Sequence, residues 1–470
     1  MRESVANTGE LGRRELLKAV AAAPLLSSLR SVARDGARPA NLLLLVSDDQ
    51  SRIDVGAHGN VDCTTPALDR LAAAGARCDR AFTQVSICRP SRASLLTGLE
   101  AHRHGATGFQ AVRDDVPTWP QLLRPAAATA LIGKLGVAPV ERFPFDFLRQ
   151  ASGPSGRQPE TCARAFGEFL GALDGRRFAA VVSFVDPHRP FWEGWESGPP
   201  RPHKAANITV PTHLVPSPET SSELAKYYDA IARLDASADA VLATLEEAGR
   251  ADDTLVIFTS DNGAPFPFAK TTLYEAGINL PFLVRWPGVA APGSVLDAMI
   301  SLVDLLPTAL DVFGLPVPET LQGRSLLPLL RGEPSVPRTS LFLEHDEHRA
   351  GHAYPMRGVR TERFKYIRNL RPELTFENSI TGVEGDDSMH PSATWRSWLR
   401  KARSHERFAN RVAAFQRRPP EELYDLAADP WELRNLAGEE ACAADLARLR
   451  AEVRAWMERE GDPLLDEFGN

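Results

Sequence analysis

The apolar residues of this 470-residue chain fall into short uninterrupted runs, with longer amphipathic stretches between them. Four runs have the length of a buried parallel strand: 41–46, 129–132, 178–185 and 254–259. Helical patterns lie between them, one from Pro66 to the stop at Gly75 and a longer one over 222–248. Strands that alternate with helices predict an α/β fold with a mostly parallel sheet covered on both faces.

Polar side chains follow each of these runs. Asp48 and Asp49 follow the first, and Asp261 and Asn262 follow the run at 254–259. The carboxyl ends of parallel strands line a common ligand crevice, so these side chains are expected to converge. Clustered carboxylates repel one another unless a cation lies between them, and ligands with only oxygen donors suit calcium or magnesium. The alternative is that each pair is a separate polar turn.

The same crevice is expected to receive polar residues from the other two runs. Lys134 follows the run at 129–132, and the segment Asp186-Pro187-His188-Arg189 follows the run at 178–185. The bland interpretation of 186–189 is a simple turn. Its position directly after a buried strand favours a functional role.

The first forty residues have the pattern of a targeting segment. Arg13 and Arg14 precede a short apolar stretch over 19–29, which is typical of a twin-arginine export signal. We expect residues 1–38 to be removed and the protein to reach the bacterial periplasm or the exterior. A short amphipathic helix is the alternative. The chain contains no run of eighteen apolar residues, so we expect no transmembrane segment.

Composition narrows the class of protein. Hydrophobic residues make up 43% and charged residues 24%, which excludes a disordered chain, and the net charge of −7 argues against nucleic-acid binding through bulk charge. Five cysteines in an exported protein leave at least one outside any intramolecular disulfide. Pairing among four of them stays open: Cys63, Cys78, Cys162 and Cys442.

The most specific stretch is Cys88-Arg-Pro-Ser-Arg92, followed by Thr97-Gly98. Pro90 predicts a helix start here, so Cys88 stands where a helix N-terminus favours a neighbouring anion. Such a cysteine is a candidate nucleophile, and a structural cysteine in a turn is the alternative.

This stretch resembles the maturation signature of type I, formylglycine-dependent sulfatases. Further segments are similar to the sulfamidase branch, the N-sulfoglucosamine sulfohydrolases: 143–147, 186–189, 254–274, 301–308, 354–357 and 423–436. The resemblance implies an alkaline-phosphatase-like α/β/α sandwich over 39–352. It also implies a smaller C-terminal α+β domain with an antiparallel sheet over 353–470.

The resemblance also implies roles for individual residues. Cys88 is oxidised to Cα-formylglycine by a formylglycine-generating enzyme, and the aldehyde hydrate attacks sulfur. One Ca²⁺ per chain is held by Asp48, Asp49, Asp261, Asn262 and the group at position 88. The remaining catalytic residues are Arg92, Lys134, His188 and Lys270, and the residues assigned to the substrate are Asp186, Arg189 and His348.

The implied reaction is exo-acting removal of the N-sulfate from glucosamine at non-reducing ends of heparin- or heparan-type saccharides. A carbohydrate O-sulfatase is the alternative within the class, with a phosphonate or phosphodiester hydrolase a more distant one. A catalytically impaired sulfoglycan-binding homologue is the alternative of another class. The oligomeric state is left open between a monomer and a homodimer.

Two departures from the family pattern bear on this hypothesis. Glycine stands at 136, where the family has a histidine that assists breakdown of the sulfated hydrate, and Lys270 replaces the arginine common in sulfamidases. His58, His102 and His104 are possible substitutes, although each is more simply a surface or loop histidine. The segment 344–348, with His352, is interpreted as a substrate-recognition loop rather than a second metal site.

Overall fold

A computed structural model describes residues 41–191, 202–348, 353–382 and 391–469. The signal expected over residues 1–38 lies outside the described residues and stays a prediction. The chain from Arg38 onward forms one compact unit.

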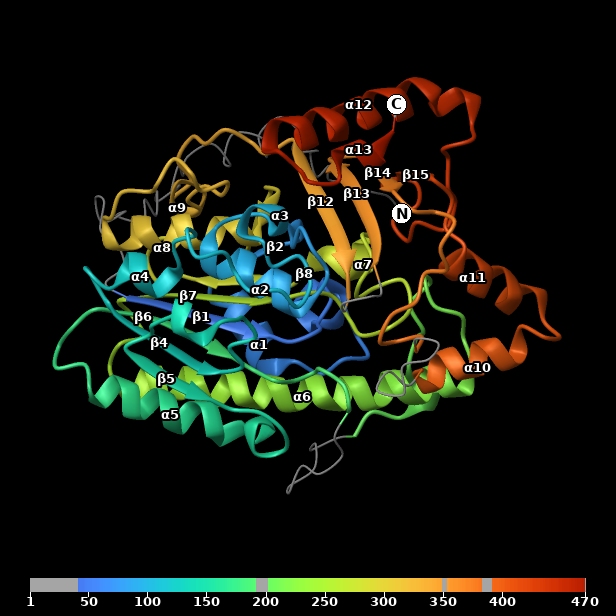
Figure 1. Cartoon of the computed structure of the whole chain (residues 1–470). Helices are drawn as coiled ribbons and strands as arrows, with labels where there is room; N and C mark the ends of the chain where they lie inside the picture. Colours follow the sequence, from blue (N-terminus) through green and yellow to red (C-terminus); the bar gives the residue numbers. More distant parts are fainter. Residues whose placement is uncertain (1–40, 192–201, 349–352, 383–390, 470) are drawn as a thin grey trace, which may run out of the picture. The chain divides into compact units, whose positions relative to one another are not determined.

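An eight-stranded sheet forms the centre of this unit (Figure 1). The four predicted runs are its β1, β4, β6 and β7, and the pairs β1–β6, β1–β7 and β4–β6 are parallel. Among the described strands of this sheet, only β9 runs antiparallel to its neighbours, β2 and β7, which confirms that the sheet is mostly parallel. In spatial order the strands are β10 (Ser294–Leu296), β2 (Ala76–Cys78), β9 (Phe282–Arg285), β7 (Thr254–Ser260), β1 (Asn41–Ser47), β6 (Phe178–Ser183), β4 (Ala128–Gly133) and β5 (Phe147–Gln150).

Helices cover both faces of this sheet, which explains why its central strands are apolar without alternation. In β1, Leu42 and Leu44 belong to one core cluster, whereas Leu43 and Leu45 belong to another. The first cluster includes side chains of α2 (Cys88–Thr97), α4 (Trp119–Leu123) and α8 (Leu305–Phe313). The second includes side chains of α1 (Pro66–Ala73), α5 (Pro159–Gly171) and α6 (Pro218–Glu247). The predicted α/β/α layering is therefore present.

A separate four-stranded antiparallel sheet follows towards the C-terminus. It consists of β12 (Ser340–Glu347), β13 (Ala353–Thr361), β14 (Phe364–Asn369) and β15 (Glu421–Asp425). Helix α12 (Ala443–Glu460) packs on it through Leu449, Val453 and Trp456. The domain boundary proposed near residue 353 would fall between β12 and β13.

One strand expected from the sequence is divided in the structure. The alternating run 359–367 is not continuous, because the chain turns at Glu362 and Arg363 and pairs β13 with β14. Arg360 lies opposite Lys365 in this hairpin. Alternation continues through the tight turn, so the apolar pattern alone does not reveal it.

Shorter elements complete the described chain. A small sheet contains β11 (Ile300–Ser301), β3 (Ala81–Phe82) and β8 (Asn279–Leu280). The other helices are η1 (Arg52–Asp54), η2 (Gly56–His58), α3 (Ala101–His104), η3 (Val140–Arg142), η4 (Ser155–Arg157), η5 (Ala205–Asn207), α7 (Glu275–Ile278), η6 (Leu302–Asp304), α9 (Leu327–Leu330), α10 (Ala393–Lys401), α11 (Glu406–Gln416), η7 (Glu440–Cys442) and α13 (Leu465–Phe468). None of the described helices has both the length and the apolarity to cross a bilayer.

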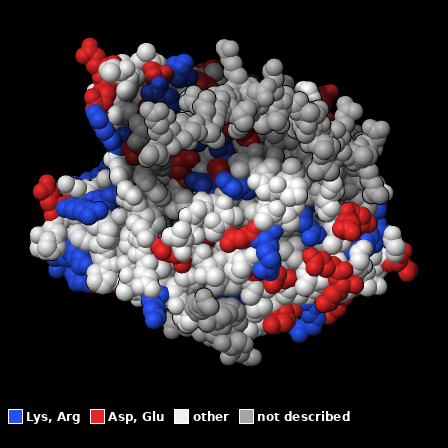
Figure 2. All heavy atoms as spheres, turned by 180° about the vertical axis from the view of Figure 1, so that it is seen from behind, with Lys and Arg blue, Asp and Glu red and all other residues white. Residues whose placement is uncertain are grey.

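Charged side chains of both signs lie on the surface, and the cysteines form no disulfide. Figure 2 shows lysine and arginine side chains interspersed with aspartate and glutamate on the face turned away in Figure 1. All five cysteines are free thiols, and Cys63, Cys78 and Cys162 are buried.

Candidate active site

The loops after β1 and β7 bring four of the predicted metal ligands together. These strands are parallel neighbours with Ser47 opposite Ser260, so the residues that follow emerge side by side. The backbone N–H of Asp49 donates to Oδ1 of Asp261 at 3.1 Å, and Nδ2 of Asn262 donates to Oδ1 of Asp49 at 2.8 Å. Asp49 has a φ of 71°, a costly conformation for a residue other than glycine, which is typical of functional sites.

Three oxygen atoms of this cluster have no hydrogen-bond donor among the described residues. They are Oδ1 of Asp48, Oδ2 of Asp49 and Oδ1 of Asn262. All three residues are buried, where an unpartnered polar atom is costly. A divalent cation would satisfy three oxygens at once, and oxygen donors suit Ca²⁺. The donor set therefore fits the metal that the resemblance implies.

The fourth predicted ligand, Asp261, is more heavily engaged. Its Oδ1 accepts from two backbone N–H groups, those of Asp49 and Asn262, and its Oδ2 accepts from Nε of Arg92 at 2.7 Å. His188 is instead the residue that offers a ligand atom within 4.8 Å of atoms from both Asp48 and Asp49. Its Nε2 lies 3.8 Å from Oδ2 of Asp49. His188 therefore lies at the same opening as the free oxygens.

Three predicted cationic residues surround the carboxylates. Lys134 pairs with Asp48, Nζ of Lys270 lies 2.6 Å from Oδ1 of Asp49, and Arg92 pairs with Asp261. Burial alone would lower the pKa of Lys270, but the charge of Asp49 holds it above its usual value. Lys134 behaves in the same way, with Asp48 outweighing burial in its pKa. Both ammonium groups therefore remain charged at the site.

The two best-buried aspartates respond differently to these cations. Burial opposes ionisation of Asp48, yet Lys134, His188 and Arg92 hold its pKa well below the usual range. Burial raises the pKa of Asp261 to about 7, against the effect of Arg92. A cation beside Asp261 would favour its ionised form.

Helix α2 places the candidate nucleophile beside this cluster. Cys88 is the first residue of α2 and is half-buried. Cys88 is one of the electrostatic neighbours that raise the pKa values of Arg92, Lys134 and Lys270, so its side chain lies near all three. The helix is fixed to the metal loop by Ser91, whose Oγ bonds to the carbonyl of Asp261. Sequence reasoning missed this role of Ser91, although the residue stands inside the recognised signature.

Two residues assigned to the substrate are engaged inside the protein instead. The carboxylate of Asp186 is buried and accepts from Arg157 and, through Nε at 2.6 Å, from Arg233. Arg189 donates through Nη1 to Glu223 at 2.7 Å. Both oxygens of the Asp186 carboxylate are thus occupied by buried arginines, and the substrate contact expected from the sequence stays a prediction. The carbonyl of Asp186 accepts from the N–H of Asp48 at 3.1 Å, so the residue positions the metal loop.

His348 lies close to the start of α2 through an aromatic contact that the sequence did not reveal. Its ring stacks on Phe109 with the centroids 6.2 Å apart, and the guanidinium of Arg89 lies 4.8 Å from the centre of the same ring. Nη1 of Arg89 also donates to the carbonyl of Phe109 at 2.7 Å. Because Phe109 is 42% exposed, it offers an aromatic surface next to Cys88.

The segment 344–348 is not the recognition loop that we expected from the sequence. Residues 344–347 belong to β12, and Glu344 and His345 are buried. Glu344 accepts from the backbone N–H groups of Ala101 and His102 at the start of α3. The carboxylate therefore caps a helix rather than facing a ligand. His352 lies outside the described residues.

None of the three substitute histidines reaches the site. His58 bonds to Asp79, His102 bonds to Glu344, and both ring nitrogens of His104 are occupied by Ser94 and the N–H of Ala106. His102 and His104 are also buried, so the expectation of surface positions is wrong for them.

Gly136 has a conformation that disfavours the histidine of the family. Its φ is +69°, and a Cβ added there would lie 2.5 Å from Cδ of Arg92. That guanidinium is held at its far end by Asp261, the carbonyl of Lys134 and Ser183. Arg92 therefore occupies the space into which a side chain at 136 would point.

Comparison with known proteins adds sequence and structural similarity over nearly the whole chain. Residues 40–315 match the family described as sulfatase, and residues 266–377 match the N-sulphoglucosamine sulphohydrolase C-terminal family. Human N-sulphoglucosamine sulphohydrolase is 35% identical, covering 91% of this chain and 91% of its own. An ulvan-active sulfatase of Formosa agariphila is 28% identical, covering 91% and 82%.

Solved structures share the fold at lower identity. The structure of BT4656 in complex with its substrate D-glucosamine-2-N,6-O-disulfate gives a TM-score of 0.69 at 20% identity, covering 92% of this chain and 100% of the other. The phosphonate monoester hydrolase of Agrobacterium radiobacter gives a TM-score of 0.70 at 21% identity, covering 90% and 96%. The alkaline-phosphatase-like fold class expected from the sequence is thereby confirmed.

Proposed function

The chain belongs to the sulfatase family, whose members hydrolyse sulfate esters or sulfamates, and from this premise we propose that it removes the N-sulfate from glucosamine. The substrate proposed is a non-reducing end of a heparin- or heparan-type saccharide. Two similarities support sulfated glucosamine: the human relative is named for N-sulphoglucosamine, and BT4656 was solved with a glucosamine N,O-disulfate as its substrate.

One observation carries the proposal of a sulfate-cleaving site. Three buried, unpartnered oxygens of Asp48, Asp49 and Asn262 lie among charged Lys134 and Lys270. Such an arrangement can hold a divalent cation and an anionic group together, because the cation and the ammonium groups offset the negative charge of a bound sulfate. A neutral ligand would not interact favourably with the positive charge of the cation and the two ammonium groups.

We assign each side chain a role in that reaction. Asp48, Asp49, Asp261 and Asn262 would hold Ca²⁺, which polarises a sulfate oxygen as a Lewis acid. Cys88, oxidised to formylglycine by a formylglycine-generating enzyme, would supply the nucleophilic oxygen.

The remaining residues would manage charge and protons. Lys134 and Lys270 would neutralise the sulfate oxygens, and Arg92 would orient Asp261. His188 would protonate the departing nitrogen, a step that general acids accelerate by about 10²–10⁴-fold. Burial lowers the pKa of His188, whereas the charges of Asp49 and Asp48 oppose that effect and favour the imidazolium form that would donate the proton.

The decisive experiment measures sulfate release from two substrates by protein matured with a formylglycine-generating enzyme. N-sulfated glucosamine and 6-O-sulfated N-acetylglucosamine are compared side by side, with Cys88→Ala as the control without a nucleophile. Release only from the first supports the proposal. Release only from the second keeps the mechanism and replaces the substrate with an O-sulfate ester.

A second candidate rests on Gly136. Without the histidine expected at 136, the protein would be a sulfoglycan-binding homologue with impaired turnover. Mass spectrometry that confirms formylglycine at Cys88, combined with binding but no sulfate release from either compound, would favour this candidate.

The proposed route to the periplasm by a twin-arginine signal is tested separately, by the N-terminal sequence of the secreted protein.

A further inference from the structure

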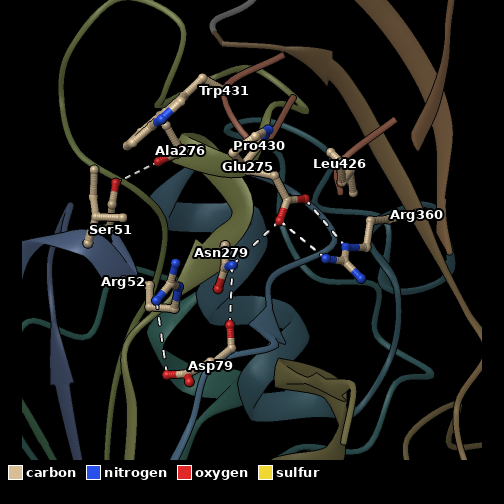
Figure 3. A pocket seen from close by; sticks show the side chains of 11 residues that line it. Ser51, Arg52, Asp79, Glu275, Ala276, Asn279, Arg360, Leu426, Pro430 and Trp431 are labelled. Carbon is tan, nitrogen blue, oxygen red and sulfur yellow. Dashed lines mark hydrogen bonds and ion pairs between the residues drawn. The ribbon is translucent and has the colours of Figure 1, made fainter. Parts of the chain in front are cut away.

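A second cavity of about 510 Å³ lies apart from the catalytic cluster (Figure 3). It opens between the loop after β1, helix α7 and the loop that follows β15. None of its lining residues belongs to the catalytic cluster. Ser51 separates the two sites, since its Oγ accepts from the N–H of Ala264 and donates to the carbonyl of Ala276. The volume lies in the usual range for small-molecule sites.

One wall of this cavity carries a cation whose hydrogen-bonding capacity is unused. No described residue accepts a hydrogen bond from Nε of Arg52, and its Nη1 lies 4.0 Å from Oδ1 of Asp79. Asp79 is already bound at shorter distances, by Nδ1 of His58 at 2.9 Å and by Nε of Arg77 at 3.3 Å. Arg52 is therefore not needed to neutralise Asp79.

The opposite wall is balanced in charge. Nζ of Lys365 forms an ion pair with Glu275 at 2.8 Å, and Arg360 lies 3.5 Å from both oxygens of Glu275. Lys365 also pairs with the buried Glu432 at 2.8 Å. On this wall the cations Arg360 and Lys365 lie beside the carboxylates Glu275 and Glu432. When Arg52 and Asp79 of the other wall are added, together with Arg77, which pairs with Asp79, the total is four cations and three carboxylates. Arg52 is the cation in excess.

The cavity also offers groups that suit a hydroxylated ring. Oδ1 of Asn279 is buried and receives no hydrogen bond from any described residue. The indole of Trp431 lies at the rim, and its stacking on His213, with centroids 5.4 Å apart, fixes its orientation (Figure 3). The apolar C–H face of a pyranose packs on such a ring, while its hydroxyls donate to amide and carboxylate oxygens.

We propose that this cavity binds an acidic pyranose, a sugar ring that carries one carboxylate. The carboxylate would bind the guanidinium of Arg52, which can donate two parallel hydrogen bonds. A ring hydroxyl would donate to Asn279, and the ring face would lie against Trp431. A single negative charge matches the single excess cation. The site goes beyond the proposed function, and it does not depend on turnover.

Binding of glucuronic acid to the purified full-length protein tests the proposal, with glucose as the neutral control. Affinity is measured by calorimetry and ligand-observed NMR. We expect measurable binding of glucuronic acid and about tenfold weaker binding of glucose, because the charge-assisted hydrogen bonds are lost. Arg52→Ala should weaken glucuronic acid to the level of glucose, and Trp431→Ala should weaken both sugars.

Arg331→Ala is the matched control. Arg331 is similarly exposed and has its nearest carboxylate, Glu333, also at 4.0 Å, but it does not line the cavity. Its loss should leave both affinities unchanged. Thermal unfolding of each variant verifies folding, and Arg52→Lys provides a second variant that keeps the charge.

Two outcomes would overturn the proposal. The first is glucuronic acid affinity that is the same in Arg52→Ala and wild type, since the sugar would then bind elsewhere, the catalytic site included. The second is equal affinity for glucose and glucuronic acid. Sulfate release plays no part in this readout, so a failure here leaves the proposed hydrolase untouched, and the reverse also holds.

Discussion

Two buried charge clusters in this protein are built on different principles. In the C-terminal sheet, Arg357 donates through Nε to Asp462 at 2.5 Å and through Nη2 to the other oxygen at 3.1 Å, while Nη1 donates to Asp346 at 2.7 Å. In the loop after β1, by contrast, one carboxylate oxygen of Asp48 and one of Asp49 lack any hydrogen-bond donor among the described residues.

The difference separates a structural cluster from a functional one. In a buried ion pair that is fully hydrogen-bonded, the mutual attraction offsets the cost of desolvation. A buried carboxylate with a free oxygen keeps part of that cost, which a bound cation or donor would remove. Removing a charge should therefore cost stability in the first cluster and metal binding in the second. Four predictions follow this contrast from the largest effect to the smallest.

The largest effect is expected from Asp48→Asn. The substitution keeps the shape but removes the negative charge beside the free Oδ1, so Ca²⁺ should be lost and sulfate release should fall by at least about 10³-fold. Stability of the metal-free protein should fall less than it does in Asp462→Asn, because the released Lys134 side chain is 23% exposed and reaches water. Metal content by mass spectrometry and chemical denaturation with chelator provide the two readouts. Full activity in a thoroughly demetallated sample would contradict the metal site.

The opposite behaviour is expected from Asp462→Asn. Breaking this fully buried pair leaves Arg357 with Asp346 as its remaining ion-pair partner among the described residues, and should lower the free energy of unfolding by about 3–5 kcal/mol. Sulfate release per folded molecule should stay within about twofold of wild type. Asp425→Asn is the matched control, because its partner Arg363 is 64% exposed, and a change of less than about 1 kcal/mol is expected. Equal destabilisation by both variants would erase the distinction between buried and exposed pairs.

A pH-dependent effect of intermediate size is expected at Glu344. Burial raises its pKa, but His102 outweighs burial and the pKa falls to about 2, while Glu344 holds the pKa of His102 above its usual value. The Glu344 contribution is present above its unfolded pKa of about 4.5 and is lost as the pH falls towards 2; that of His102 is present below about 6.5 and is lost at higher pH. Glu344→Gln should therefore cost most between about pH 4.5 and 6.5, by about 3 kcal/mol.

Chemical denaturation of Glu344→Gln and wild type at a series of pH values measures this window. The difference between the two proteins should shrink as the pH falls from 4.5 to 2. A difference that stays constant over that range would mean that Glu344 acts only as a neutral helix cap.

The strands and ligand loops of the site were easier to predict from the sequence than the buried hydrogen-bond partners behind them. The central strands and the ligand loops after them were predictable, because a strand buried on both faces leaves an unbroken apolar run and its polar successor is conspicuous. The structural use of Asp186 was not predictable, since its partners Arg157 and Arg233 lie far from it along the chain. The same holds for Glu344, whose strand has the sequence of a polar loop, because Glu344 accepts from α3, distant along the chain, and Asp346 accepts from Arg357 of β13.

Position 136 gives the smallest but most discriminating prediction. If its glycine were merely a lost histidine, Gly136→His should raise sulfate release. The structure predicts a fall of about tenfold or more, because a Cβ 2.5 Å from Cδ of Arg92 must displace a side chain that is pinned at its far end and pairs with Asp261. Gly153→Ala is the matched control, since Gly153 has a similar φ of +62° but open space around it. Gly136→Ala and Gly153→Ala share the backbone strain, so only the first should lose activity. Increased sulfate release by Gly136→His would show instead that the Arg92 side chain can move aside. It would also show that the site can accommodate the catalytic histidine that this chain lacks.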